Sequence, residues 1–499
     1  MRNFLALGLA LLSLGLLPGR ARAYQIELDA ETIGQAYTLR AGDDTLVNSR
    51  RLTQYLGLNV YGLGPTDLYG QPLDRDQFYV SISMRFDAEL GDFSNLAEMS
   101  GRTPQDLLSA DRLELLYALV GGRDLGGFLD VKLGRQILVD LFDYQSFDGL
   151  WLRAKTPFHV AVEAWGGLNV TGAAPFDSPV FRADGVALGG NEVGSLAARQ
   201  EDALEPTFGV ALSTFGLRDV SARLSYSRTI SPTEDPQPGE PSSGVVGEQV
   251  GLTARARLFD GLIVPWFGLR YNLLAGRLDE LHGGARLLVH RAHSLSLEYV
   301  FAAPTFDGDS IWNVFGAEAF NDARLTYALT LGRFGLFATG FSRFFGEERT
   351  SQGAVDPSLL PLGTSVAYGG TAGAALASRR GSGRLDVYYQ DGYGGQTAGV
   401  DLSGRVLVLG EWDSGVTVEG RLSYVHFADD ARAIDHADSL GVQAGVRYAI
   451  ARGLTLNVAM EENVNRFYAS QFRLLALLDI SFFVGNHGHG FSRARGWGL

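Results

Sequence analysis

The chain of 499 residues contains no cysteine and only two lysines, Lys132 and Lys155. Without cysteine no disulfide can form and no lipid can be attached through a thioether, so stability must come from hydrogen bonds and packing. Beyond residue 23, no apolar run approaches the roughly 20 residues that a membrane-spanning helix needs. These absences exclude a disulfide-stabilised domain and argue against a helical membrane protein.

The chain is instead rich in glycine, aromatic residues and acidic residues. It has 64 Gly, 29 Phe, 19 Tyr and 6 Trp, and its formal net charge is −14. This composition is typical of strands joined by tight turns and bordered by aromatic residues at membrane interfaces. The negative charge argues against nucleic acid as a partner, because phosphate binding requires a basic surface.

Residues 1–23 have the organisation of a secretory signal peptide. Arg2 precedes an apolar run from Phe4 to Leu17, and Ala21-Arg-Ala23 supplies the small residues of a cleavage site. We therefore predict a signal peptide at 1–23, a main domain at 24–484 and a short C-terminal tail at 485–499.

Alternation of apolar and polar side chains dominates the main domain. Between Val80 and Leu90 every even-numbered residue is apolar, and every odd-numbered residue is Ser, Arg, Asp or Glu. Successive side chains of a β-strand point to opposite faces, so this segment has one apolar and one charged face. A tilted strand of about 9 to 11 residues crosses a bilayer, and we predict that residues 80–90 form such a strand.

The same pattern recurs along the chain and predicts an all-β fold, a transmembrane antiparallel up-and-down β-barrel of about 22 strands. The predicted strands lie at 25–39, 52–63, 80–90, 113–120, 128–134, 150–155, 158–168, 207–214, 220–228, 250–258, 263–273, 281–289, 294–302, 323–331, 334–343, 365–377, 384–390, 398–408, 416–424, 440–450, 454–464 and 472–482. Three connections have unexpected lengths, so 18 or 20 strands are alternatives, as is a glycine-rich soluble β-protein.

The lengths of the connections predict an orientation. Most short connections follow even-numbered strands and most long ones follow odd-numbered strands, whereas bacterial barrels have short periplasmic turns and longer outer loops. This places the protein in the bacterial outer membrane with both termini in the periplasm. The tail 485–499 would then be periplasmic, and the partners would be membrane lipids, lipopolysaccharide and the barrel-assembly machinery.

If the apolar faces contact lipid, the alternate residues line the lumen. Charges cannot face hydrocarbon, where an arginine at the bilayer centre costs about 2 to 4 kcal/mol. The predicted basic lumen residues are Arg85, Lys132, Arg153, Arg223, Arg255, Arg257, Arg270, Arg286, Arg324, Arg384, Arg405, Arg421, Arg447 and Arg473. The predicted acidic lumen residues are Asp87, Glu89, Glu114, Asp130, Glu163, Glu298, Asp386, Asp401, Glu419, Glu461 and Asp479.

The slight excess of basic residues on this face has two interpretations. A basic lumen attracts anions by focusing the electric field, which favours a passive channel or export pore for anionic solutes. Alternatively, arginines and carboxylates pair across strands and stiffen the wall, and both uses can coexist.

A wide barrel without a plug needs a constriction, for which the connections 91–110 and 169–206 are the candidates. The competing function is a non-conducting structural or surface-interaction barrel whose lumen is filled by loops.

Two short motifs carry a family resemblance. Gly134, Arg135 and Gln136 lie at and just after the end of one predicted strand, and Phe147, Asp148 and Gly149 lie just before the next; they match a Gly-Arg-Gln and Phe-Asp-Gly hairpin. This hairpin resembles that of alginate-export-like and related porin-type outer-membrane barrels. The resemblance implies a monomeric barrel that passes an anionic polysaccharide through an arginine-lined pore narrowed by loops.

No residue set indicates catalysis. His159 and Glu163 are the best pair of a histidine and an acid, but four residues of strand separate them by about 13 Å. The acidic segment 429–438 has oxygen ligands that suit calcium, although a solvated charged loop is the preferred interpretation. We therefore predict no enzyme activity, no cofactor and no metal site.

The candidate constrictions can be tested by deletion. Removing residues 91–110 or 169–206 is expected to raise the single-channel conductance in a planar bilayer, because the narrowest part of the pore would widen. Unchanged conductance in both deletion variants would contradict the assignment of these segments.

Overall fold

The computed structural model describes residues 25–41, 44–63, 78–91, 112–140, 143–170, 205–230, 244–303, 319–345, 366–429, 434–466, 468–485 and 488–491. Within these ranges no helix is both long and apolar enough to span a membrane. The predicted signal peptide 1–23 and nearly all of the connections 91–110 and 169–206 lie outside the described residues.

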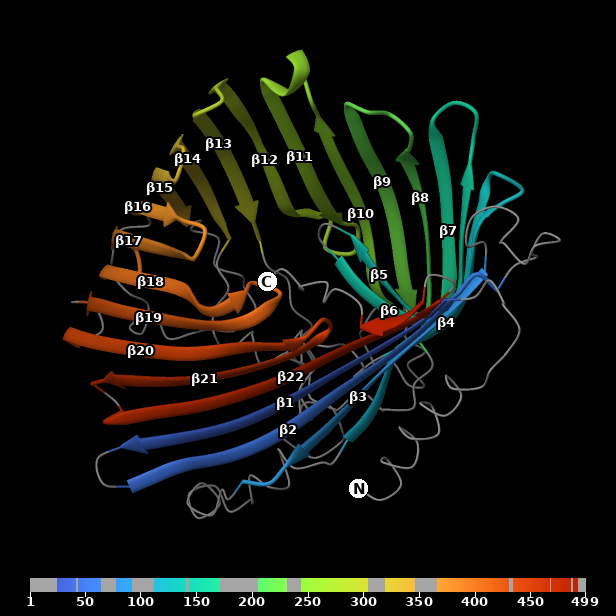
Figure 1. The fold of residues 1–499 in the computed structure, drawn as a ribbon. Coiled ribbons are helices and arrows are strands. Elements are labelled where there is room, and N and C mark those ends of the chain that lie inside the picture. The colour runs from blue at the N-terminus through green and yellow to red at the C-terminus, as the bar shows by residue number, and fades with distance from the viewer. Residues whose placement is uncertain are drawn as a thin grey trace, which may run out of the picture.

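The structure is a closed barrel of 22 antiparallel strands, to which a short 23rd strand is added (Figure 1). The strands are β1 (Gln25–Ala41), β2 (Asp44–Tyr61), β3 (Phe78–Glu89), β4 (Arg112–Leu125), β5 (Leu129–Asp140), β6 (Asp143–Lys155), β7 (Val160–Asn169), β8 (Pro206–Thr214), β9 (Val220–Ile230), β10 (Val245–Ala256), β11 (Ile263–Asn272), β12 (Arg277–His290), β13 (His293–Ala302), β14 (Phe320–Leu331), β15 (Phe334–Phe345), β16 (Val366–Ala377), β17 (Gly381–Gly392), β18 (Gln396–Glu411), β19 (Ser414–Asp429), β20 (Ile434–Ala451), β21 (Leu454–Asn465), β22 (Ser470–Gly485) and β23 (Gly488–Phe491). A 3-10 turn, η1 (Phe259–Gly261), joins β10 to β11.

Each long strand pairs with its neighbours in sequence, and β22 pairs with β1 from Ile26–Val484 to Arg40–Ser470. Figure 1 shows β22 beside β1, and this pairing closes the wall. Closure leaves no long strand with an unpaired edge, as a membrane-spanning sheet requires. The predicted number of 22 strands is confirmed, and 18 or 20 strands are excluded.

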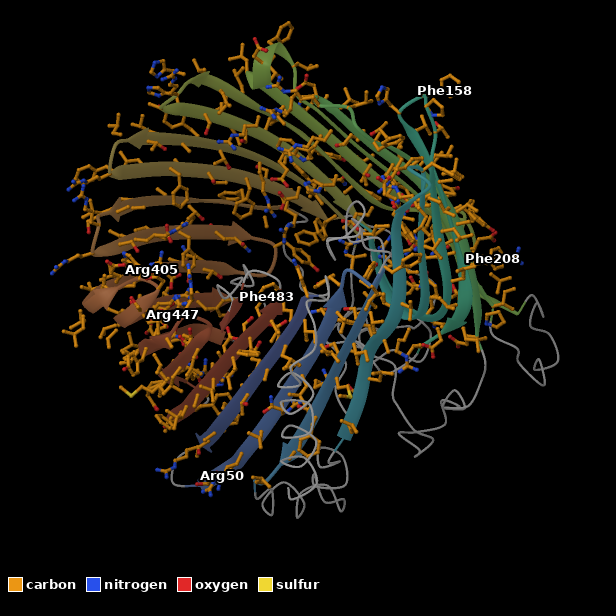
Figure 2. All side chains as sticks on the ribbon, turned by 45° about the vertical axis from the view of Figure 1, so that its right-hand side comes forward. Arg50, Phe158, Phe208, Arg405, Arg447 and Phe483 are labelled. Atoms are coloured by element: carbon orange, nitrogen blue, oxygen red, sulfur yellow. The ribbon has the colours of Figure 1, made fainter. Side chains whose placement is uncertain are left out.

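Side chains alternate between the two faces of the wall. On β19, Val418 and Leu422 are exposed on one face, whereas Glu419 and Arg421 lie on the other. Figure 2 shows Phe208 of β8 on the outside of the wall and Phe158 at the tip of the turn between β6 and β7. The outer surface is therefore apolar and the inner surface charged, which is the architecture of an outer-membrane β-barrel.

The two ends of the barrel differ in their connections. The short-turn end holds the connections that follow even-numbered strands, which are short except for residues 62–77 between β2 and β3. The long-loop end holds the connections that follow odd-numbered strands, including all of the other long ones. The start of β1 and the end of β22 lie at the short-turn end.

The predicted boundaries are wrong in several places. β5 continues to Asp140 and β6 starts at Asp143, although the alternation stops near Gly134 and resumes only at Leu150. Pairing between the two backbones continues without a register shift, because backbone hydrogen bonds do not depend on the side-chain pattern. Part of the predicted tail also forms a strand, since β23 pairs with residues 482–485 of β22.

The prediction that His159 lies within a strand is wrong. His159 lies in the turn before β7 with a φ of 59°, and its ring is 6.0 Å from that of Phe215. This left-handed conformation belongs to the turn, and β7 begins at the next residue, Val160. His159 and Glu163 therefore do not share one strand face, and the pair is not a catalytic site here either.

Close backbone contact between β6 and β7 requires glycine at two paired positions. Gly149 lies opposite Gly167, and a Cβ on Gly149 would be 2.1 Å from the carbonyl oxygen of Gly166. A Cβ on Gly167 would be 2.2 Å from the carbonyl oxygen of Asp148. Side chains at either position would push the two strands apart.

A Gly149→Val substitution is expected to lower the free energy of unfolding by about 2 to 3 kcal/mol, because the new side chain overlaps backbone atoms that cannot move independently. The measurement is urea unfolding in detergent micelles, followed by tryptophan fluorescence. Gly340→Val is the matched control, since nothing lies within 4 Å of a Cβ built on Gly340. Equal stability of the two variants would contradict the close-contact explanation.

Candidate functional site: the charged lumen

Strand register places the predicted lumen residues on the inner face. Arg324 lies between Glu298 and Phe341 in one row, and Arg405 lies opposite Glu419 in another. The same register places the other predicted basic and acidic residues on this face, except for Arg257, which follows the end of β10, and the side chain of Glu89 is not described. The structure then separates these residues into ion-paired groups and exposed ones.

The Arg85 guanidinium forms ion pairs within a buried network. Its Nε is 3.0 Å from Asp87 Oδ2 and its Nη2 is 2.5 Å from Glu114 Oε2. Arg51 Nη2 and the Thr53 hydroxyl contact Asp87 Oδ1 at 2.9 and 2.5 Å. Arg85 is only 3% exposed, so this guanidinium stabilises the wall and is not available to a solute.

Glu163 and Asp322 each hold two arginines. Glu163 accepts Arg223 Nη1 at 2.7 Å and lies 3.6 Å from Arg153 Nε. Asp322, which is completely buried, is 2.7 Å from Arg324 Nε and 2.8 Å from Arg343 Nη2. These clusters join neighbouring strands, so cross-strand pairing explains much of the predicted basic lining.

Aromatic packing fills the inner face of β5 to β8. Phe147, Trp165 and Ala211 form a buried cluster against which Leu138 and Trp151 pack. In this region the ammonium of Lys132 lies 4.7 Å from the ring centroid of Trp151. Cation–π contact reduces the availability of this lysine to a solute.

The residues of the two family motifs lie side by side on β5 and β6. Register pairs Gly134 with Gly149, Arg135 with Asp148 and Gln136 with Phe147. Arg135 and Asp148 form a two-point ion pair at 2.8 Å for both contacts, and Arg135 Nη1 also donates to the Leu115 carbonyl oxygen. Gln136 donates to the Gly149 carbonyl oxygen at 3.1 Å. These contacts hold the hairpin together and give the motif a structural role.

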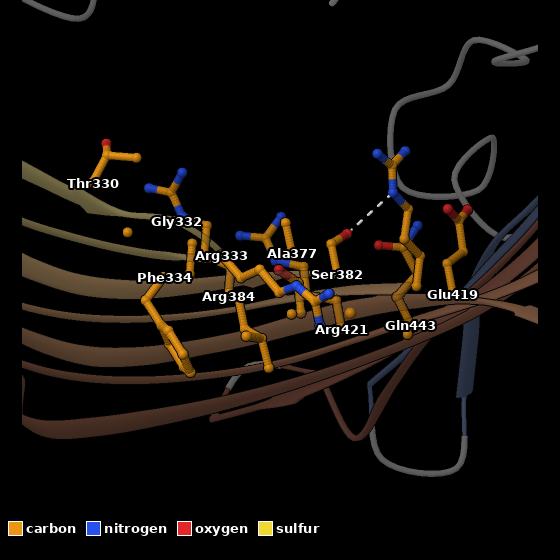
Figure 3. A pocket seen from close by; sticks show the side chains of 18 residues that line it. Thr330, Gly332, Arg333, Phe334, Ala377, Ser382, Arg384, Glu419, Arg421 and Gln443 are labelled. Carbon is orange, nitrogen blue, oxygen red and sulfur yellow. Dashed lines mark hydrogen bonds between the residues drawn. The ribbon is translucent and has the colours of Figure 1, made fainter. Parts of the chain in front are cut away.

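A pocket of about 560 Å³ opens on the inner wall of β14 to β20 towards the short-turn end (Figure 3). Its lining contains four arginines and one acid, with small residues between them. The charged lining residues are Arg333, Arg384, Arg405, Arg421 and Glu419, and the lining also contains Ser382, Ser403 and Gln443.

The pocket arginines are held in place but remain accessible. Arg384 Nε is 2.6 Å from Asp386, and Arg421 Nη2 is 2.9 Å from Asp401, yet both side chains are more than half exposed. Arg405 donates to the Ser382 hydroxyl at 3.2 Å and stacks 5.3 Å from the Trp412 ring centroid. Guanidinium edges anchored in this way suit the two-point binding of a carboxylate, phosphate or sulfate.

Other exposed arginines occupy inner-face positions of β10, β12 and β20, and one more, Arg257, follows the end of β10. Within the described residues, Arg255, Arg257, Arg286 and Arg447 form no ion pair with a carboxylate. They differ from Arg85 and Arg324 because the facing residues are uncharged: Arg255 lies opposite Ser221 and Trp266, and Arg286 opposite Val264 and Ser296. Unpaired positive charge therefore collects on β10 to β12 and on β18 to β20.

Sequence reasoning missed several members of these groups. Asp322 and Arg51 each lie one residue before a predicted strand start, so an inner-face list built from those strands omitted them. Arg343 was missed because the inner face of β15 also carries Phe337 and Phe341, which obscures the alternation. Extending each strand by two residues along the same face would have found Asp322 and Arg51.

The acidic segment 429–438 is only partly described. Residues 430–433 lie outside the described residues, whereas Asp438 Oδ1 accepts hydrogen bonds from the Tyr424 hydroxyl at 2.7 Å and contacts His426 Nδ1 at 2.9 Å. No group of three or more metal-ligating side chains occurs among the residues that the structure describes.

Comparison with known proteins gives only distant structural likeness. No family model matches the chain, and no curated protein matches it. The structure of OccAB4 of Acinetobacter baumannii is 9% identical in sequence; the match covers 94% of this chain and 100% of OccAB4, with a TM-score of 0.42. OccK9 (OpdG) of Pseudomonas aeruginosa is 12% identical; the match covers 92% of this chain and 98% of OccK9, with a TM-score of 0.42. A BenF-like porin from Pseudomonas fluorescens is 11% identical; the match covers 93% of this chain and 100% of the porin, with a TM-score of 0.39.

Removing the Arg85 guanidinium is expected to be strongly destabilising, because Asp87 and Glu114 would remain buried without it. An Arg85→Met variant should lose about 3 to 5 kcal/mol of unfolding free energy, as breaking a buried ion pair usually does. Arg255→Met, at an exposed site, should stay within about 0.5 kcal/mol of the unchanged protein. Urea unfolding in detergent micelles measures both, and a small loss in the first variant would contradict the buried network.

Proposed function

We propose that the protein is a passive outer-membrane channel whose lumen favours anionic solutes. The observation that carries this proposal is the exposed arginine pocket formed by Arg333, Arg384, Arg405 and Arg421 on the inner wall. Exposed guanidinium groups on a water-filled, low-dielectric wall attract anions and offer them two-point hydrogen bonds. In this proposal both termini lie in the periplasm, and the long loops lie at the cell surface.

Acidic saccharide is the preferred cargo within the class of anionic solutes. Aromatic rings accompany two of the pocket arginines, since Arg384 lies 4.9 Å from the Phe337 ring and Arg405 lies beside Trp412. A flat ring next to a guanidinium suits a sugar acid, which presents an apolar ring face and a carboxylate. Ser382, Ser403 and Gln443 add hydrogen-bonding groups for hydroxyls.

Anion preference can be measured as a reversal potential in a planar bilayer under a KCl gradient. We expect chloride to be favoured over potassium, and we expect the double substitution Arg333→Gln with Arg405→Gln to lower the permeability ratio about twofold or more. Neither arginine forms an ion pair with a carboxylate of the described residues, so the loss of charge should not unfold the barrel.

The matched control removes two arginines from the long-loop end, as Arg40→Gln with Arg50→Gln. Both of these side chains are exposed near the ends of β1 and β2, away from the pocket (Figure 2 labels Arg50). The control should keep the original permeability ratio. A cation-selective or electrically silent barrel would contradict the proposal, and silence would support the non-conducting structural or surface-interaction barrel.

A further inference from the structure

A tryptophan lies between two arginines on the inner wall of β10 to β12. Arg255 of β10 lies directly opposite Trp266 of β11, and Trp266 lies opposite Gly284 of β12. Arg286 is two residues beyond Gly284 on the same face of β12, which makes it a diagonal neighbour of Trp266 at about 7 to 8 Å. The indole therefore has an arginine on the strand at each side.

The indole of Trp266 lies along the wall and is only half-buried. A Cβ built on Gly284 would be 2.5 Å from Cζ2 and 2.8 Å from Cε2 of Trp266. The ring thus covers this glycine and turns its other face towards the lumen. Among the residues that the structure describes, its N–H donates to no group, unlike that of Trp412, which donates to the Arg379 carbonyl oxygen at 2.9 Å.

Positive charge is in excess around the indole. Both neighbouring arginines are exposed, and within the described ranges neither forms an ion pair. Two carboxylates border the site: Glu298 lies opposite Arg324 and contacts His282 Nε2 at 2.6 Å. Asp219 lies beside Arg257, whose backbone N–H donates to its carbonyl oxygen at 2.7 Å. Each carboxylate thus has its own basic neighbour, and the two arginines beside the indole are left to attract an anion.

An indole face with a guanidinium on each side matches the chemistry of an acidic sugar. The apolar face of a sugar ring packs against an aromatic ring, and a carboxylate accepts two parallel hydrogen bonds from a guanidinium. The indole N–H adds a donor for a sugar hydroxyl.

A row of hydroxyl groups leads from Arg286 towards the pocket. On β13 to β16 the register continues this row with Ser296, Thr326, Thr339 and Thr371. The hydroxyl oxygens of Thr326 and Thr339 are 2.9 Å apart. Thr339 shares its face of β15 with Phe337, two residues away, whose ring lies 4.9 Å from Arg384 of the pocket. Uncharged hydrogen-bonding groups therefore connect the two arginine sites.

We infer that Trp266, Arg255 and Arg286 form a second subsite for an acidic sugar, joined by the hydroxyl row to the pocket as one track for an acidic oligosaccharide. The inference rests on the proposed channel function and specifies a chain of sugars as its cargo. Arg286 and Arg384 lie five strands apart, which is about 24 Å along the wall. A single sugar therefore occupies one subsite, and only an oligomer bridges both.

The experiment compares galacturonic acid with hexagalacturonate as blockers of the single-channel current in a planar bilayer. In the unchanged protein the hexamer should block at a sugar concentration about tenfold or more below that of the monomer, because two subsites act on one molecule. Equal block by equal amounts of sugar would contradict a joined track.

Two substitutions of Trp266 separate ring stacking from packing. Trp266→Leu keeps an apolar side chain without a flat ring and should raise the half-blocking concentration of hexagalacturonate about fivefold. Trp266→Phe should stay within about twofold of the unchanged protein. Hexaglutamate, a polyanion without sugar rings, should block all three proteins equally. A Trp266→Leu variant that loses both blockers alike, or neither, would overturn the stacking role.

The arginines and the hydroxyl row have separate variants. Arg255→Gln combined with Arg286→Gln should weaken the block by hexagalacturonate about tenfold, because two-point hydrogen bonds are lost. Thr326→Val combined with Thr339→Val should weaken the hexamer about threefold and leave the monomer unchanged. The matched control, Arg40→Gln combined with Arg50→Gln at the long-loop end, should keep the original values for both blockers.

Ion selectivity distinguishes failure of the second subsite from failure of the proposed function. Trp266→Leu changes no charge and should keep the chloride-to-potassium permeability ratio of the unchanged protein. A chloride-selective channel that hexagalacturonate blocks equally with and without the Trp266 ring would overturn the second subsite and leave the proposed function intact. A cation-selective or electrically silent protein would overturn both.

Discussion

The structure depends on the hydrogen bonds between the first and last long strands. A sheet that crosses a lipid bilayer cannot leave backbone N–H and C=O groups unpaired, and pairing β1 with β22 satisfies the edges of both. Once the wall is closed, it has one outer and one inner face, and each residue is assigned to lipid or lumen by its position in the register. The apolar exterior, the charged interior and the grouping of arginines all follow from this closure.

Charge inside the barrel serves two purposes that the structure keeps apart. Where arginines and carboxylates alternate on neighbouring strands, as around Asp322, they form compact clusters that stabilise the wall. Where the neighbouring inner residues are uncharged, as Val264 and Ser296 are beside Arg286, the guanidinium remains exposed. The cross-strand neighbour therefore decides whether an inner arginine is structural or available to a solute.

Much of the fold could be predicted from the sequence, because apolar side chains face lipid and polar ones face the lumen, so the two kinds alternate along each strand. The strand count follows from the number of alternating segments. The inner-face position of residues such as Arg421 follows from their place in the alternation. Strand ends were less accessible, since β5 and β6 continue through residues 135–149 by backbone pairing without a clean side-chain pattern. Which arginines are paired was also inaccessible, because the commitment of Arg85 to Glu114 depends on a register shift between Ser83 and Met84.

The contact between β1 and β22 also constrains the order in which the barrel can form. Ser481 donates to Asp29 and Gln471 donates to the Tyr37 hydroxyl, across sequence separations of 452 and 434 residues. The amino-terminal strand must therefore wait, with one edge unsatisfied, until the carboxy-terminal strand has been synthesised and delivered. Contacts this remote in sequence fold slowly, and an unsatisfied edge invites association with other chains. Safe assembly thus depends on shielding a single strand throughout the time that the remaining wall takes to form.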